Sequence, residues 1–188
     1  IALCYFLVNS IATFFLLLGI FVDLVIYTWW LKRRNPVNIL IGSFAGGSLP
    51  LYGWSSFTGE FLSPIPWLIA AIVVVWTPSH IWSLALYYKE DYERARVPML
   101  PVVIDERKAI RCISSTVPLI FLMTILLGLY GGYGWIYWVL VIPSGIPYLL
   151  FGIRSILKPE RRSYWILYKM SSPYLGITLT APFLALLA

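Results

Sequence analysis

Charged residues are scarce in this sequence of 188 residues, where they make up only 12% of the chain. A soluble domain carries about 25% charged residues. Hydrophobic residues, by contrast, make up 60%. This balance excludes a disordered chain, a nucleic-acid-binding module with a solvated basic face, and almost any water-soluble enzyme, so we expect no nucleic-acid partner.

Cysteine and histidine are also scarce. The chain has two cysteines, Cys4 and Cys112, and one histidine, His80. Zinc and iron–sulfur sites need several such ligands at short spacings, which these residues do not have. The sequence therefore argues against both kinds of metal site and implies no disulfide framework.

The sequence has long apolar runs instead, and several reach the ~18–20 residues that cross a bilayer. The runs are Asn9–Leu31, Pro36–Thr58, Ile65–Tyr88, Ile113–Tyr130, Tyr133–Ile153 and Met170–Ala188. They predict an all-α, polytopic membrane protein with six transmembrane helices in a single domain, residues 1–188, in contact with the lipid bilayer. The short apolar run Ile1–Val8 and the lack of an initiating Met lead us to expect the C-terminal portion of a longer protein.

The charges alternate along the chain. All fourteen Lys and Arg residues fall in three loops, Lys32–Arg34, Lys89–Arg111 and Arg154–Lys169, while the other connections hold one charge, Glu60. The positive-inside rule places the three basic loops in the cytoplasm or an equivalent matrix. We expect a multi-pass protein of the cell membrane, or of the mitochondrial inner membrane if the source is eukaryotic.

Polar residues within the runs are candidates for function, because they are costly in hydrocarbon. Asp23 lies one helical turn before Tyr27, so both should share a face, although Asp23 could instead hydrogen-bond to a neighbouring helix. His80, Tyr87 and Asp91 fall on one helical stripe, with His80 about 16 Å deeper than Asp91. A lone histidine is normally a packed core residue, but this stripe favours a polar path from the charged side.

The charged loops suggest a second feature. Lys32, Arg33 and Arg34 form a basic cluster, and the loop that begins at Lys89 carries carboxylates, among them Asp91. Cations beside carboxylates suit a diphosphate bound partly through Mg²⁺, although such a loop is usually a solvated cap. The apolar sequel Val97–Val103 should fold back over the membrane surface. Together these features suggest transfer of a prenyl group.

Four segments resemble a known family. They are Tyr27–Gly42, Leu49–Trp54, Trp76–Ala85 and Asp91–Val103, in the same order along nearly the whole chain. Their sequences are similar to motifs of the protoheme IX farnesyltransferases (haem O synthases), which are UbiA-type intramembrane prenyltransferases with nine transmembrane helices. The six runs would correspond to the last six helices.

This resemblance implies a reaction. Farnesyl diphosphate would bind with Mg²⁺ and ionise to an allylic cation, which a vinyl group of haem b attacks. Addition of water would complete haem O, the precursor of haem A. Haem A synthase or oxidase assembly proteins are then possible partners.

The resemblance also implies roles for individual residues. Asp91 would bind the metal, and Lys32 and Tyr27 would hold the departing diphosphate. The expected substrate-binding residues are Arg33, Asn38, His80 and Asp23. His80 would lie near the haem or the prenyl chain, and Asp23 stands where many family members have Tyr.

Two other interpretations remain open from the sequence. The chain could belong to a prenyltransferase that modifies a quinone or a lipid head group. It could also belong to a transporter or channel in which Asp23 and His80 relay protons or ions. A transporter would have no need of the Pro98–Pro101 loop and would show no dependence on Mg²⁺, so these two features distinguish it from a prenyltransferase.

Overall fold

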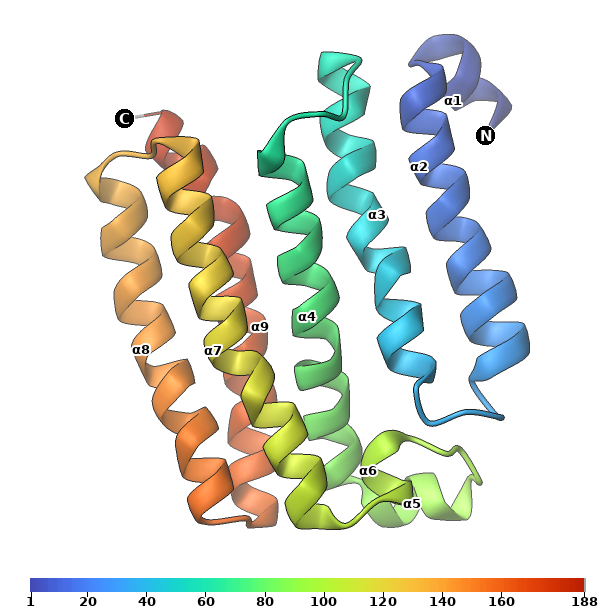
Figure 1. Cartoon of the computed structure of the whole chain (residues 1–188), viewed down its shortest axis with the longest axis vertical. Coiled ribbons are helices and arrows are strands. Elements are labelled where there is room, and N and C mark those ends of the chain that lie inside the picture. Colours follow the sequence, from blue (N-terminus) through green and yellow to red (C-terminus); the bar gives the residue numbers. More distant parts are fainter. Residues whose placement is uncertain (188) are drawn as a thin grey trace.

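The computed structural model describes residues 1–187, which fold into helices with no strand among them. Six long helical rods stand side by side (Figure 1). The first rod is α2, Ser10–Phe21, which continues into a π-helix, η1, Val22–Leu31. The other five are α3 (Asn38–Thr58), α4 (Pro64–Tyr87), α7 (Glu106–Gly131), α8 (Trp135–Leu157) and α9 (Arg161–Leu186). Three short helices complete the fold: α1 (Ala2–Leu7), α5 (Lys89–Arg94) and α6 (Leu100–Val103).

Four of the rods are long and apolar enough to cross a membrane by composition alone: Ser10–Leu31, Pro64–Tyr87, Glu106–Gly131 and Trp135–Leu157. The remaining two, α3 and α9, are of similar length but less apolar. Four serines and four glycines lower the apolar content of α3, and α9 begins with charged residues. The protein is therefore an all-α, multi-pass membrane protein, as the sequence predicts, and its six rods correspond to the six expected helices.

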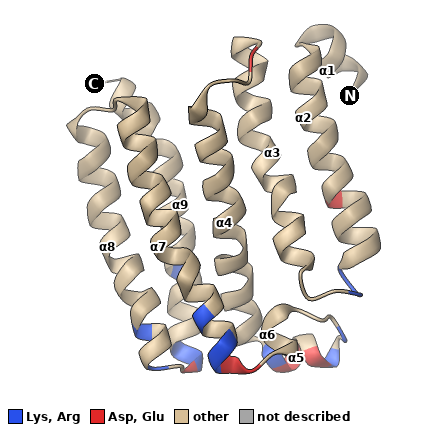
Figure 2. Ribbon diagram, viewed as in Figure 1, with Lys and Arg blue, Asp and Glu red and all other residues tan. Residues whose placement is uncertain are grey.

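The charges gather at one end of the bundle (Figure 2). Lys and Arg residues lie at or near the end that holds α5 and α6, and an acidic residue, Glu60, lies in the α3–α4 connection at the opposite end. This arrangement agrees with the sidedness expected from the sequence, because all three basic loops face the same way. We call this end the charged face.

Two helices extend further into the charged segments than the apolar runs predict. Helix α7 begins at Glu106 because the Asp105 side chain caps it, accepting hydrogen bonds from the backbone N–H groups of Arg107 and Lys108 at 3.0 and 3.2 Å. Helix α9 begins at Arg161, so Lys169 lies two turns inside a helix rather than in a loop. Long basic side chains permit this because their charged ends reach back toward water.

Helix α4 lies at the centre of the bundle and packs against α3, α7 and α9. Its close approach to α3 depends on Gly47, where an added Cβ would lie 2.5 Å from Val74 Cγ2 and 3.3 Å from the Ala70 carbonyl oxygen. The segment from Val97 to Val103 folds back as expected. Met99 within it is only 4% exposed and belongs to the core around α4 and α7.

Candidate functional site

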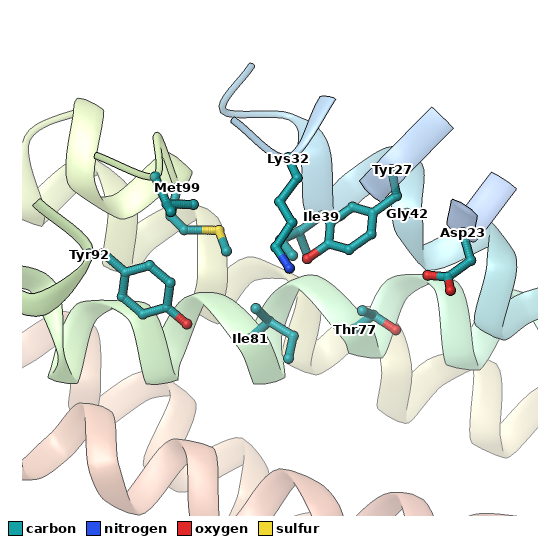
Figure 3. Close-up of a pocket in the computed structure, with 10 residues that line it drawn as sticks. Asp23, Tyr27, Lys32, Ile39, Gly42, Thr77, Ile81, Tyr92 and Met99 are labelled. Atoms are coloured by element: carbon teal, nitrogen blue, oxygen red, sulfur yellow. The ribbon is translucent and has the colours of Figure 1, made fainter. Parts of the chain in front are cut away.

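The candidate site is a cavity of ≈ 480 Å³ near the charged face, between η1, α3, α4 and the α5–α6 segment (Figure 3). Polar side chains from three of these elements line it together with apolar ones. The lining residues are Asp23, Tyr27, Lys32, Ile39, Gly42, Thr77, Ile81, Tyr92, Val97 and Met99. The cavity thus combines a cation, a carboxylate and two phenols with an apolar wall.

The π-helix explains how three polar side chains of one element reach the same cavity. The backbone N–H of Lys32 donates to the Tyr27 carbonyl at 2.8 Å, which closes a turn over five residues instead of four. Because of this wider turn, the side chains of Tyr27 and Lys32 lie on the same side of the helical segment, the side that lines the cavity. Asp23 lines the cavity from this side as well. Such turns often occur at functional sites. The expectation that Asp23 and Tyr27 share a face is met, although by a π-helix rather than an α-helix.

Two neighbours hold this end of the π-helix in place. The buried Asn38 side chain donates through Nδ2 to the Lys32 carbonyl at 3.1 Å. Gly42 leaves room for the Tyr27 ring, because a Cβ at that position would lie 2.7 Å from Tyr27 Cδ2. Lys32 Nζ lies 5.7 Å from the centre of the same ring. Asn38 therefore fixes the backbone at Lys32, and Gly42 allows α3 to pack closely against the Tyr27 ring.

Tyr92 approaches the cavity from the opposite side. It comes from α5, and Figure 3 shows its hydroxyl directed toward Ile81 of α4. Burial raises the pKa of the Tyr92 phenol above its ordinary value. The phenol is therefore a neutral hydrogen-bond donor at neutral pH. No motif in the sequence predicts a role for Tyr92 by itself, although its place next to Asp91 in an acidic segment is a usable signal.

Asp91 does not line the cavity. Its carboxylate is exposed on α5 and lies 3.9 Å from the Arg94 guanidinium. Arg33 is exposed as well, at the end of the π-helix. Asp91 is adjacent in sequence to Tyr92, whose side chain does line the cavity.

The predicted stripe from His80 to Asp91 is wrong. Helix α4 ends at Tyr87, and the chain turns at Tyr88 into α5, so the helical spacing does not continue to Asp91. His80 does not line the cavity. It contacts α9 instead, where its Nδ1 lies 2.7 Å from Ser171 Oγ. The structure therefore brings together Asp23, Tyr27 and Lys32, and separates them from His80.

The residues present suit a metal ion that arrives with its ligand. Within residues 1–187, no group of three or more His, Cys, Asp or Glu side chains is placed to hold an ion. Mg²⁺ usually takes only one or two protein carboxylates and fills its remaining positions with phosphate oxygens and water. Asp23, which lines the cavity, and Asp91, which directly precedes the cavity residue Tyr92, supply two carboxylates for that limited requirement.

A second, apolar cavity of ≈ 430 Å³ lies between segments of the same helices, farther from the charged face, and shares no lining residue with the first. Its walls are almost entirely hydrocarbon. They come from α2, η1, α3 and α4: Phe15, Leu18, Val22, Phe44, Gly47, Ser48, Leu51, Trp67, Ala70, Ala71, Val74 and Val75. Phe15 packs edge-on against Trp67 and Phe61, with ring centres 6.1 and 6.2 Å apart. The two cavities together suit an amphipathic molecule with an anionic head and an apolar tail.

Comparisons with known proteins agree with this chemistry. The model of the UbiA prenyltransferase family matches residues 1–173. A protoheme IX farnesyltransferase of Desulforudis audaxviator (strain MP104C) is 44% identical over 90% of this chain and 53% of its own length. Two others, from Thermoplasma volcanium and Cenarchaeum symbiosum (strain A), are 37% and 42% identical over 94% of this chain. The chain spans 61% and 59% of those two relatives.

No solved structure matches the chain. The family match nevertheless covers most of it, and the three relatives align along nearly its whole length. On the family match, the chain belongs to the UbiA prenyltransferase family.

Proposed function

We propose that the complete protein transfers a farnesyl group from farnesyl diphosphate to a vinyl group of haem b and so forms haem O. The single observation that carries this proposal is the pair of cavities, one polar and one apolar, which lie one beyond the other along η1, α3 and α4. The relatives' names supply the identity of the two substrates. The match covers only part of each relative, so the reaction is assigned to the complete protein.

The polar cavity would receive the diphosphate. The Lys32 ammonium supplies a positive charge, and the Tyr27 and Tyr92 phenols supply neutral hydrogen-bond donors. Asp23 and Asp91 would hold Mg²⁺, which neutralises phosphate charge when it is bound. As the bond between C1 and oxygen breaks, both of its electrons leave with the diphosphate, and these groups stabilise the charge that develops there.

The apolar cavity would hold the farnesyl tail, because its lining excludes water and offers only hydrocarbon and aromatic contacts. The π electrons of a haem vinyl group form the new bond to C1 of the farnesyl cation. The positive charge then resides on the adjacent vinyl carbon, which water captures with loss of one proton. The product carries a hydroxyethylfarnesyl group, and an enzyme that oxidises haem O further, such as haem A synthase, would consume it.

Analysis of cellular haems tests this proposal. The complete protein is expressed in cells that lack their own haem O synthase. The haems are then extracted and separated, and their masses are determined by mass spectrometry. We expect a new haem heavier than haem b by one farnesyl group and one hydroxyl group. Haem b alone, together with a newly prenylated quinone, would support transfer to a different acceptor and contradict the proposal.

Membrane fractionation of the same cells locates the protein, which we expect in the cytoplasmic membrane, or in the mitochondrial inner membrane of a eukaryote.

A larger side chain in the apolar cavity should change the preferred length of the prenyl donor. Ala71 is half-buried and lines this cavity. Ala71→Phe fills part of the space that the last isoprene unit would occupy, so the ratio of kcat/KM for farnesyl over geranyl diphosphate should fall by about 10–100-fold. The measurement is the initial rate with each donor at fixed haem b.

Ala185→Phe is the matched control. Ala185 is also half-buried, but it lies near the C-terminal end of α9 and packs against the core cluster of Tyr137, Val141 and Ala181, whose residues do not line the apolar cavity. It should leave the ratio between the two donors unchanged even if it lowers stability. An unchanged ratio in Ala71→Phe would mean that the tail lies elsewhere.

A further inference from the structure

A further pocket lies at the charged face, and the proposed reaction does not use it. Its volume is ≈ 360 Å³, and it lies between the end of α4, helix α5 and the first turns of α7 and α9. The lining residues are Leu86, Tyr87, Lys89, Glu90, Glu93, Glu106, Arg161 and Tyr164. None of them lines the polar cavity around Lys32. We call it the charged pocket, and its mixture of cations and carboxylates suits a ligand that carries charges of both signs.

The positive side of the charged pocket is a guanidinium in a fixed position. Arg161 Nε donates to the Tyr87 carbonyl at the end of α4, at 3.1 Å. The guanidinium carbon lies 4.8 Å from the centre of the Tyr87 ring, which in turn lies 4.7 Å from the centre of the Trp165 ring. Within residues 1–187, the terminal nitrogens of Arg161 take part in no hydrogen bond or ion pair. A guanidinium whose terminal N–H groups are free is well suited to phosphate oxygens.

Carboxylates from two helices form the negative side. Glu106, in the first turn of α7, accepts a hydrogen bond from the hydroxyl of the buried Tyr164 at 2.5 Å, which fixes its position. Neither Glu106 nor Glu93 of α5 belongs to an ion pair in the described part of the chain, so Arg161 does not neutralise them. No group of carboxylates in residues 1–187 is placed to hold a metal ion. An ammonium group, with its several N–H donors, suits these separate oxygens.

The depth of the charged pocket indicates which molecule brings a phosphate and an ammonium together. Tyr87 packs against Tyr88 and Trp165, with ring centres 4.7 Å apart in each pair, and aromatic side chains of this kind are typical of the membrane–water interface. The charged face itself lies at the level of the lipid headgroups (Figure 2). Leu86 and Tyr164 are buried and give the pocket an apolar wall. Pockets with basic side chains between transmembrane helices on this side of a membrane bind lipid headgroups.

We propose that the charged pocket binds the headgroup of a membrane phospholipid that carries a primary ammonium, such as phosphatidylethanolamine. The phosphate accepts hydrogen bonds from Arg161 and lies near Lys89, while the ammonium donates to Glu93 and Glu106. A choline headgroup cannot donate in this way, because its nitrogen is fully methylated. A glycerol headgroup has no positive charge for the carboxylates. The pocket therefore selects ethanolamine over both.

Helix α5 is a wall of both the charged pocket and the polar cavity. Glu90 and Glu93 line the charged pocket, whereas Tyr92 lines the polar cavity. Glu90 and Tyr92 are two residues apart, so at 3.6 residues per turn their side chains leave the helix in nearly opposite directions. A helix of six residues is marginal by itself. A headgroup bound on one side of α5 therefore also holds Tyr92 in place on the other side.

Native mass spectrometry of the complete protein in detergent tests the selectivity. The protein is titrated separately with dioleoyl phospholipids whose headgroups are ethanolamine, choline or glycerol. We expect the ethanolamine lipid to bind about 10–100-fold more tightly than the other two, because only its ammonium forms hydrogen bonds to the carboxylates. Equal affinity for the three lipids overturns the proposal.

Free phosphoethanolamine distinguishes a lipid site from a site for a soluble phosphate ester. At millimolar concentration it should displace the bound ethanolamine lipid, because it carries the same two charged groups. A protein that binds free phosphoethanolamine but retains no lipid would assign the pocket to a soluble ligand and overturn the proposal.

Arg161→Gln should lower the affinity for the ethanolamine lipid by about 10–100-fold, because glutamine has no charge for the phosphate. Arg162→Gln is the matched control, since Arg162 is exposed next to Arg161 and does not line the charged pocket. This control should bind the lipid as the parent does. If Arg161→Gln does not fold, Glu106→Gln serves, because its amide oxygen can still accept from Tyr164, and it should remove the preference for ethanolamine over choline. Parent-like affinity in Arg161→Gln, or an unchanged preference in Glu106→Gln, overturns the proposal.

Hydrogen exchange measures the effect on α5. The ethanolamine lipid should slow exchange of the backbone amides of residues 89–94 several-fold, whereas the choline lipid should not, and Arg161→Gln should abolish the slowing. This measurement needs neither haem nor farnesyl diphosphate, so its result is independent of the proposed reaction. Lipid binding that leaves exchange in α5 unchanged would overturn the inference that the headgroup holds Tyr92 in place.

Discussion

Lys32→Met should lower kcat/KM for farnesyl diphosphate by about 10²–10³-fold in the complete protein, the usual effect of removing one electrostatic stabiliser of a transition state. Lys32 is the only cation that lines the polar cavity within the described residues, and its ammonium lies beside the Tyr27 ring. Methionine keeps the length and apolar character of the side chain but removes the charge that faces the departing phosphate. The measurement is the rate of haem O formation over a range of donor concentrations.

Arg34→Met is the matched control. Arg34 is exposed in the same loop and does not line the cavity. A positive charge near the membrane surface also serves to orient the chain, and this role alone could explain Lys32. Both variants keep two of the three cations in this loop, so both should insert normally. Equal rates in the two variants would contradict the assignment of Lys32 to the diphosphate.

Asp91→Asn should have the second large effect, a loss of about 10²–10³-fold in turnover, if Asp91 holds Mg²⁺ as proposed. Asparagine keeps the size of the side chain but removes the charge that attracts the ion. Folding should change little, because the carboxylate is exposed and its one ion pair, to Arg94, spans 3.9 Å at the surface. The measurement is turnover as a function of Mg²⁺ concentration, which should show a raised requirement.

Glu90→Gln provides a close comparison. Glu90 precedes Asp91 on α5, is exposed as well and also lies near Arg94, at 3.8 Å. If these carboxylates only stabilise the first turn of α5 in water, each substitution should lower turnover to the same small extent. Only a role in binding the ion separates them, so similar and near-normal turnover in both would remove Asp91 from the site.

Much of the fold follows from the sequence because the bilayer imposes simple rules. The lengths of the apolar runs predict six rods, and the segregation of Lys and Arg predicts their direction. The boundaries are less predictable. The cap at Asp105 and the reach of Lys169 extend α7 and α9 into segments whose charge suggests loops.

The site was predictable where its residues belong to one continuous segment. Asp23, Tyr27 and Lys32 meet in one cavity because they lie on one element. The π-helix that aligns them has no clear signature in composition, so the sequence gives no reason to expect its wider turn. Tyr92 and Met99 reach the cavity only because the chain reverses after α4, and that reversal also breaks the expected stripe between His80 and Asp91.

The most direct test of the central claim uses the purified complete protein, haem b and deuterium-labelled farnesyl diphosphate, with and without Mg²⁺. The claim is that one polar cavity and a second, apolar cavity bind a prenyl diphosphate for transfer to haem. We predict that one labelled farnesyl group appears on the haem only when Mg²⁺ is present, and that Lys32→Met nearly abolishes this product. Unlabelled haem b in every sample, with the label intact as diphosphate or attached to another acceptor, would contradict the claim.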